Sequence, residues 1–152
     1  MSEERALAAL DASGLEYQIA RHPPVNSLEE AAAARGVEPA AVIKSIVVRR
    51  ADDDYVFVLV PGDRTIAWPK LRALLGVSRL SMPDADTARD VTGYERGTIT
   101  PFGSTQAWPV IADQRIQGRT VSIGAGAFGV AATVGGDELL KALDATVADV
   151  TE

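Results

Sequence analysis

Apolar positions along the chain follow two patterns, one typical of helices and the other typical of strands. Apolar spacing, together with cap residues, predicts five helices, at 3–12, 27–34, 68–75, 83–91 and 137–143. Short β-branched runs predict strands at 17–20, 42–49, 55–60, 109–112, 120–123, 129–133 and 147–150. Strands and helices therefore share one sheet-based fold.

Local signals sharpen several of these boundaries. Ser27 and Glu30 form a capping box at the start of the second helix, which Gly36 ends. The third helix has Pro69 in its first turn and is expected to bury its three leucines, Leu71, Leu74 and Leu75. The acidic turn at 51–54 predicts that strands 42–49 and 55–60 form an antiparallel hairpin.

No repeat, low-complexity block or long linker divides the 152 residues. The sequence therefore predicts a single domain over residues 1–152, of mixed α/β (α+β) class. We expect a central mixed, largely antiparallel β-sheet flanked by helices.

Composition excludes several kinds of chemistry. The chain has no cysteine and one histidine, His22, so disulfides, thiolate nucleophiles and cysteine or His-rich zinc sites are excluded. A Ser-His-Asp triad is possible only through His22, and no metal or cofactor is expected. The formal net charge of −6 is atypical of proteins that hold nucleic acid by broad phosphate contact. We expect no DNA partner.

The sequence contains no pattern typical of a membrane span or a signal peptide. No apolar run approaches the ~20 residues that span a bilayer, and residues 1–5 lack a signal-peptide pattern. A cytoplasmic protein is expected.

Lys44 is the first candidate for chemistry, because it interrupts the apolar segment 42–48. Strand alternation places it on the same side as Val42, Ile46 and Val48. One interpretation is a lysine that protects an edge strand from aggregation or extends to water. The alternative is a cation at the floor of a pocket, holding a phosphate or a developing oxyanion.

Two glycine-rich segments are the other candidates. Segment 92–103 holds three glycines and one proline, which is typical of a loop that aims backbone N–H groups at an anion or carbonyl, although a plain connection has the same composition. Segment 124–129 contains Gly-x-Gly-x-x-Gly. A strand rather than a helix follows it, which excludes a dinucleotide site and favours a hairpin that a substrate can approach closely.

Taken together, these segments resemble the YbaK/ProX family, the prolyl-tRNA synthetase editing-domain superfamily. The matching pieces occur in order over nearly the whole chain: His22-Pro23-Pro24-Val25, the helix with Glu29-Glu30-Ala31-Ala32, Val42-Ile43-Lys44-Ser45, Val60-Pro61-Gly62-Asp63, the 92–103 loop, Ile111-Ala112-Asp113, Gly124 to Gly126, and Gly136-Asp137-Glu138-Leu139-Leu140.

The resemblance implies an aminoacyl-tRNA deacylase that acts in trans on mischarged tRNA, with tRNA-Pro carrying Ala, Cys or Ser as the expected substrate. It implies catalytic roles for Lys44 and for the loop formed by Gly97, Thr98, Ile99, Thr100 and Pro101, and substrate binding by His22, Val25, Ser45, Gly103, Gly124 and Gly126. The implied chemistry is attack by water assisted by the substrate's ribose hydroxyl. The implied partner is the acceptor end of tRNA, and a prolyl-tRNA synthetase is a second candidate partner.

One departure keeps a rival hypothesis open. Family members that act on cysteinyl-tRNA carry an acidic residue shortly after the glycine hairpin, whereas segment 129–133 has none. The rival is a catalytically inactive tRNA-end or protein-binding module of the same fold. The enzyme hypothesis predicts that Lys44, the 97–101 loop and the 124–126 hairpin converge on one cleft, with His22 near its rim.

Overall fold

The computed structural model describes residues 2–152. Its helices are α1 (Ser2–Ser13), α2 (Leu28–Arg35), α3 (Trp68–Leu75), α4 (Ala85–Thr92) and α5 (Gly136–Ala142), with short 3-10 turns η1 (Pro39–Ala41) and η2 (Gln114–Ile116). The strands are β1 (Gln18–Arg21), β2 (Val42–Ala51), β3 (Asp54–Pro61), β4 (Val110–Asp113), β5 (Thr120–Gly124), β6 (Val130–Gly135) and β7 (Thr146–Ala148). Every predicted helix and strand is therefore present, with boundaries shifted by a few residues.

The strands form one mixed sheet within residues 2–152, in the order β1-β6-β5-β2-β3-β4-β7. The β1–β6, β6–β5 and β2–β3 pairs are antiparallel, and β2–β3 is the predicted hairpin. The β5–β2, β3–β4 and β4–β7 pairs are parallel. The mixed sheet is confirmed, but "largely antiparallel" holds only in part, because the parallel pairs join segments that no short turn connects.

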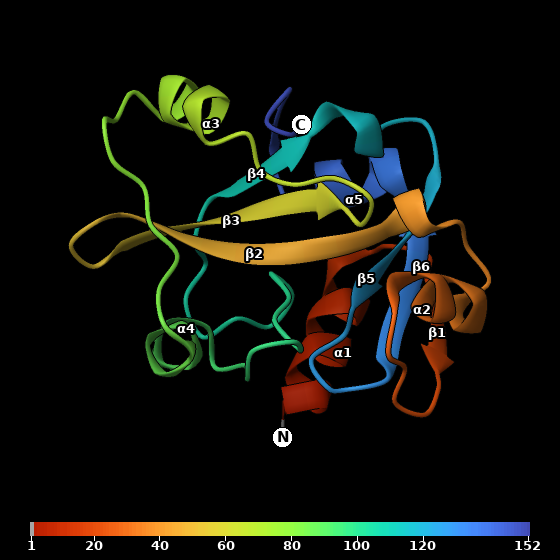
Figure 1. Ribbon diagram of the computed structural model, residues 1–152. Coiled ribbons are helices and arrows are strands. Elements are labelled where there is room, and N and C mark those ends of the chain that lie inside the picture. Colours follow the sequence, from red (N-terminus) through yellow and green to blue (C-terminus); the bar gives the residue numbers. More distant parts are fainter. Residues whose placement is uncertain (1) are drawn as a thin grey trace.

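Helices cover both faces of this sheet (Figure 1). The larger core lies where α1, α5 and the loop before β4 pack on side chains such as Phe57, Leu59 and Ile123. The smaller core lies on the opposite face, where α3 packs on Val56, Val58 and Val60. Alternation along β3 sends successive side chains to the two cores, so the strand is buried on both faces.

Capping explains where α2 begins. The Ser27 hydroxyl accepts from the Glu30 N–H at 3.1 Å, and the Glu30 carboxylate accepts from Asn26 N at 2.9 Å. The Glu30 carboxylate of the predicted capping box thus accepts from the N–H of Asn26, one residue before Ser27.

In α3, Leu71 is buried as expected, but Leu74 is 40% exposed because it lies on the solvent side of the helix. That part of the prediction is wrong.

The C-terminal segment docks on β4 through a buried carboxylate. Asp113 is fully buried and accepts hydrogen bonds from Arg115 N, Val150 N and the Thr151 hydroxyl at 3.0–3.2 Å. The guanidinium of Arg115 lies 3.2 Å from the same carboxylate and 3.0 Å from that of Asp149. This network joins the smaller core to the end of the described chain.

Asp149 gives the protein an acid-sensitive contact. Hydrogen bonds from Lys70 and Arg115 lower the pKa of Asp149 from 3.8 to about 2. A carboxyl with a depressed folded-state pKa stabilises the fold above its unfolded pKa and loses that contribution as pH falls through the folded value. We therefore expect Asp149→Asn to flatten the loss of stability between about pH 4 and pH 2. Urea unfolding at a series of pH values measures this. An equal loss of unfolding free energy between about pH 4 and pH 2 in the wild type and Asp149→Asn would contradict it.

Candidate functional site

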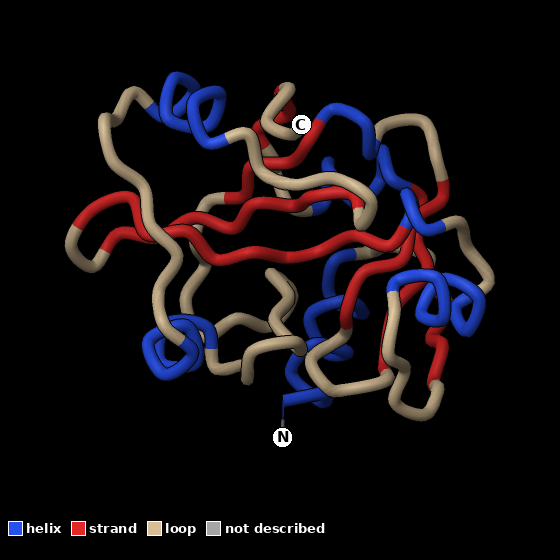
Figure 2. Tube along the Cα trace, viewed as in Figure 1, coloured by secondary structure: helices blue, strands red, loops and turns tan. Residues whose placement is uncertain are grey.

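A cavity of about 370 Å³ opens beside β2, on the side where the sheet is incomplete. Three segments line it. Their contributions are Ser45, Ile46 and Val47 from β2, then Met82 and Pro83 before α4 with Ala85 and Ala88 within it, and Arg96, Gly97 and Ile99 from the following loop. Figure 2 shows the chain between α4 and β4 as loop, running along the face of the sheet that α1 also covers.

The edge of β2 at this cavity has no neighbouring strand among residues 2–152. β5 pairs with β2 only at Val42 and Ile43. Further along the same edge, Arg49 exchanges two backbone hydrogen bonds with Ser81, at 2.7 and 3.2 Å. Alternation in an extended strand therefore directs the N–H and C=O groups of Ser45 and Val47 to this open edge. Unpaired edge groups are a template for binding another chain or a ligand.

The Ser45 side chain adds a polar group without a partner. It lies on the face of the larger core, because its cross-strand neighbour is Leu59. Its hydroxyl is buried and makes no hydrogen bond within residues 2–152. A buried hydroxyl without a partner costs free energy, about 1–3 kcal/mol, which a bound polar group would recover.

The loop after α4 turns its threonines inward and its backbone outward. The Thr98 hydroxyl donates to Glu95 O at 2.7 Å, and the buried Thr100 hydroxyl accepts from Phe102 N at 3.3 Å. Gly97, at φ +91°, and Ile99 lie at the cavity instead. The N–H groups of Gly97, Ile99 and Thr100 make no hydrogen bond within the described chain, so they are available as donors.

The glycine hairpin between β5 and β6 packs against this loop. A side chain at Gly124 would come within 3.9 Å of Ile99 O, and one at Gly97 would meet the Phe128 ring at 3.1 Å. The predicted meeting of the 97–101 loop and the hairpin is thus observed. Gly103 and Gly126 instead allow close contact with Tyr94 and α1, so a substrate-binding role for them stays a prediction.

Lys44 does not line the cavity. It lies opposite Val60, on the face of the smaller core, and its ammonium donates to Arg64 O at 2.6 Å. Partial burial lowers its pKa, and the nearby Asp63 carboxylate opposes that shift. The Lys44 side chain is therefore not among the groups that line this cavity, and its catalytic role stays a prediction. The two faces nevertheless meet at the open β2 edge, where Ile46 borders the cavity from the side of Lys44.

His22 and Val25 lie on the far side of the hairpin from the cavity lining. The backbone N–H of His22 donates to Gly129 O at 2.9 Å, and its Nε2 accepts from Arg35 Nε at 3.3 Å. Val25 is half-buried just before α2. Neither residue lines the cavity. His22 thus holds the hairpin through its backbone, and its role in substrate binding stays a prediction.

Sequence reasoning missed a groove of about 440 Å³ lined by four arginines. It lies next to the cavity, because Ser81 lines the groove and Met82 lines the cavity. Arg49 and Arg50 are paired with Asp52 and Asp54 of the hairpin turn. Within residues 2–152, Arg72 and Arg79 have no carboxylate partner. The signal was present as Arg49-Arg50, but only the fold brings α3 and residues 78–81 to that pair.

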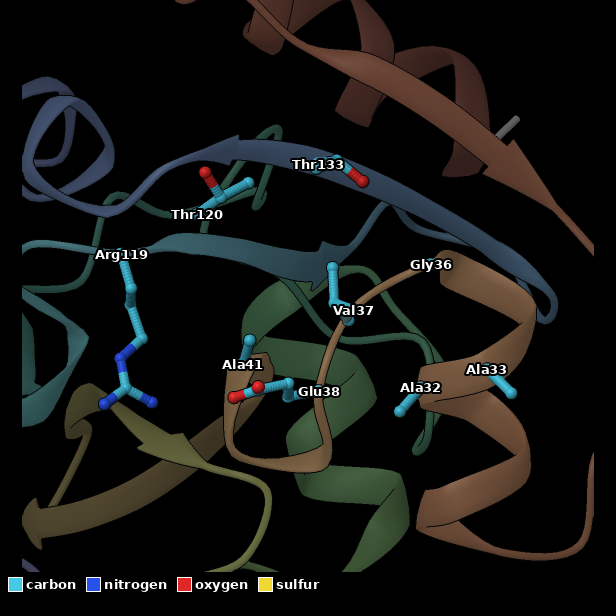
Figure 3. A pocket seen from close by; sticks show the side chains of 9 residues that line it. All are labelled: Ala32, Ala33, Gly36, Val37, Glu38, Ala41, Arg119, Thr120 and Thr133. Carbon is cyan, nitrogen blue, oxygen red and sulfur yellow. The ribbon is translucent and has the colours of Figure 1, made fainter.

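A further cavity of about 420 Å³ lies between α2 and the β5–β6 pair (Figure 3). Its walls are small side chains, including Ala32 and Ala41, with Glu38 and Arg119 on its rim. None of the predicted site residues lines it. Residues 2–152 contain no group of three or more His, Asp or Glu side chains suited to a metal ion, and none of their helices is long and apolar enough to cross a membrane.

Comparison with known proteins identifies the family of the chain. The family model for the aminoacyl-tRNA editing domain matches residues 22–142, which include β2, the loop after α4 and the glycine hairpin. The chain belongs to this family. The expected resemblance to the prolyl-tRNA synthetase editing-domain superfamily is thereby confirmed.

Relatives and solved structures agree with that assignment. Proline–tRNA ligase of Bacillus licheniformis is 33% identical over 98 residues, and that of Heliobacterium modesticaldum is 37% identical over 101 residues. The matches cover 64% and 66% of this chain but only 17% of each ligase, so the chain spans less than a fifth of these relatives.

Two solved structures match almost the whole chain. A candidate trans-editing enzyme for prolyl tRNA synthetase superposes with a TM-score of 0.91 at 27% identity, covering 99% of this chain and 97% of that one. A hypothetical protein superposes with a TM-score of 0.88 at 25% identity, covering 97% and 99%. The chain therefore shares its fold with these two structures over almost its whole length.

Proposed function

We propose that this protein is an aminoacyl-tRNA deacylase, which hydrolyses the ester between an amino acid and the terminal ribose of a mischarged tRNA. The observation that carries the proposal is the cavity between the open β2 edge and the loop at Gly97. Two rows of unpaired backbone groups flank it, in a domain of the editing family.

Those backbone groups suit an aminoacyl group. The substrate's α-ammonium is a donor, and the C=O groups of Ser45 and Val47 are acceptors at the open edge. The ester carbonyl is an acceptor, and the free N–H groups of Gly97 and Ile99 are donors. Backbone N–H groups aimed at a carbonyl stabilise the oxyanion that forms when it is attacked.

The reaction needs no protein nucleophile. Water attacks the ester carbonyl, and the C–O bond to the ribose breaks. A proton from the water passes to the leaving ribose oxygen, which becomes a hydroxyl as the free amino acid and the tRNA separate. An aminoacyl ester is already reactive, so positioning and carbonyl polarisation supply the remaining rate enhancement. A chain with one histidine and no cysteine is compatible with this chemistry.

The relatives support tRNA-Pro as the tRNA of the substrate. Proline–tRNA ligases match the chain, and a candidate trans-editing enzyme for prolyl tRNA synthetase shares its fold. We therefore propose tRNA-Pro carrying Ala, Cys or Ser as the substrate, hydrolysed in trans, with a prolyl-tRNA synthetase as a second partner.

The test is release of amino acid from tRNA-Pro charged with Ala, Cys, Ser and Pro, and from one unrelated mischarged tRNA. We expect turnover on one or more of the mischarged tRNA-Pro substrates and sparing of prolyl-tRNA. Rates equal to buffer on every substrate, with retained tRNA binding, would favour the inactive binding module.

The arginine groove explains how an acidic protein holds RNA locally. Guanidinium groups bind phosphates well, and each phosphate contact to single-stranded RNA contributes roughly 0.7 to the slope of log K against log salt. We expect the double variant Arg72→Ser, Arg79→Ser to bind tRNA more weakly and with a salt slope lower by about 1.4. Fluorescence anisotropy at several salt concentrations measures both quantities.

The control is Arg89→Ser, Arg119→Ser, which removes the same charge from arginines that do not line the groove. It should leave the slope near that of the wild type. Equal slopes in the wild type and the groove variant would exclude the groove from RNA binding.

A further inference from the structure

Phe128 is the exception among the three phenylalanines of the chain. Phe57 and Phe102 are buried, whereas Phe128 is 68% exposed at the tip of the glycine hairpin. An apolar ring held in water loses the hydrophobic stabilisation that the other two rings gain. A fold with two well-filled cores has no packing reason to place an aromatic ring there.

The hairpin holds this ring in a defined position. Ala125 N donates to Val130 O at 3.0 Å and Val130 N to Ala127 O at 3.2 Å, which closes the turn beneath Phe128. Gly129, at φ +71°, accepts from His22 N, and a side chain there would collide with His22 O. The backbone that carries Phe128 is thus held on both sides of this residue, and little backbone conformational entropy is lost when a ligand contacts the ring.

Phe128 packs against the loop that lines the cavity. Its ring lies over Gly97, where a Cβ would come within 3.1 Å of the ring edge, and Gly97 lines the cavity. The neighbouring Arg96 also lines it and is exposed. An exposed aromatic face beside a cationic side chain is the combination that binds single-stranded nucleic acid, because the ring stacks a base while the cation meets a phosphate.

We propose that Phe128 is the stacking platform for the terminal base of the RNA substrate, at the point where the aminoacyl ester enters the cavity. The proposal rests on the proposed function, which puts the RNA 3′ end at this cavity. The charge of the surroundings favours this occupant. Arg96 lines the cavity next to Gly97, on which the ring packs. The groove with Arg72 and Arg79 adjoins the cavity where Ser81 is followed by Met82. Stacking orients the terminal ribose. It does not depend on the hydrogen-bonding groups at the edge of the base.

The experiment is a double-mutant cycle on the binding of RNA that carries no amino acid. The cycle combines a substitution at Phe128 with removal of the terminal base of the RNA. The probes are a fluorescein-labelled RNA hairpin with a single-stranded CCA end and the same hairpin with an abasic terminal residue. Loss of one base stack typically costs about 5- to 150-fold in affinity. We expect Phe128→Ala to weaken binding of the CCA probe within that range. It should leave binding of the abasic probe unchanged, and Phe128→Trp should restore the discrimination.

The matched control is Leu74→Ala, which removes an exposed apolar side chain from α3, on the other face of the sheet. It should bind both probes like the wild type. Equal losses on both probes in Phe128→Ala would overturn the proposal, as would a change in oligomeric state by sedimentation, which would assign the ring to a protein contact. The probes carry no amino acid, so the binding experiment does not depend on hydrolysis. A protein that stacks the base but hydrolyses no ester would refute only the deacylase assignment.

Discussion

Replacing Lys44 by alanine is expected to lower the rate of deacylation roughly 10²–10³-fold, the usual loss when one electrostatic contact to a transition state is removed. The Lys44 ammonium makes one hydrogen bond, to a neutral carbonyl, and no ion pair within residues 2–152. Two of its three N–H donors are therefore free for an anionic group of the substrate. We propose that a substrate that fills the cavity extends past the open β2 edge to the face on which Lys44 lies.

The measurement is single-turnover release of amino acid from the mischarged tRNA on which the wild type is fastest. Lys44→Arg should also be impaired, because a planar guanidinium does not replace a compact ammonium at a tight site. Lys141→Ala, an exposed lysine on α5, is the control and should be fully active. Full activity of a folded Lys44→Ala protein would remove Lys44 from the mechanism and leave the backbone donors of the Gly97 loop.

The largest effect on stability is expected at Asp113. Removing one partner of a buried ion pair leaves the other uncompensated and commonly costs about 3–5 kcal/mol. Arg115 keeps some contact with water and Asp149, so we expect Asp113→Ala to lower the free energy of unfolding by about 3 kcal/mol. For a domain of this size, that corresponds to a fall in Tm of roughly 6–12 °C.

Calorimetry and urea unfolding check this value. Asp113→Asn should lose less than Asp113→Ala, because its amide oxygen can still accept from Val150 N and the Thr151 hydroxyl. Asp86→Ala is the control: this exposed carboxylate lies 4.0 Å from Arg89 on α4, and surface pairs contribute about 0–1 kcal/mol. A wild-type Tm for Asp113→Ala would show that the network contributes little to stability.

Local chemistry made the helices and the β2–β3 hairpin predictable. Ser27 caps α2, Gly36 and Gly76 end α2 and α3 in left-handed conformations, and a short acidic turn joins the hairpin. The parallel strand pairs have no comparable local signal in the sequence. β4 pairs with β3 and β7 across long connections, so their direction depends on packing between distant segments. The exposure of Leu74 was missed for the same reason, since it depends on how α3 lies on the sheet.

The site was predictable in its segments but not in its geometry. Glycine spacing identified both the Gly97 loop and the hairpin that packs on it. Alternation correctly put Lys44 on the side of Ile46 and Val48, yet it gives no means of knowing which face of the sheet the loop covers. The open edge at Ser45 and Val47 escaped notice because an unpaired edge is a property of the whole strand order.

That strand order also has a consequence for how the chain folds. β1, near the beginning of the chain, pairs with β6, so that Gln18 lies opposite Thr133. The β2–β3 hairpin is local and can form first, whereas the strands on either side of it close large loops before their contacts form. Domains dominated by such non-local pairing fold on the scale of milliseconds to seconds. We therefore expect slow, hairpin-initiated folding, with the β2 edge at Val42 and Ile43 exposed to other chains until β5 pairs with it.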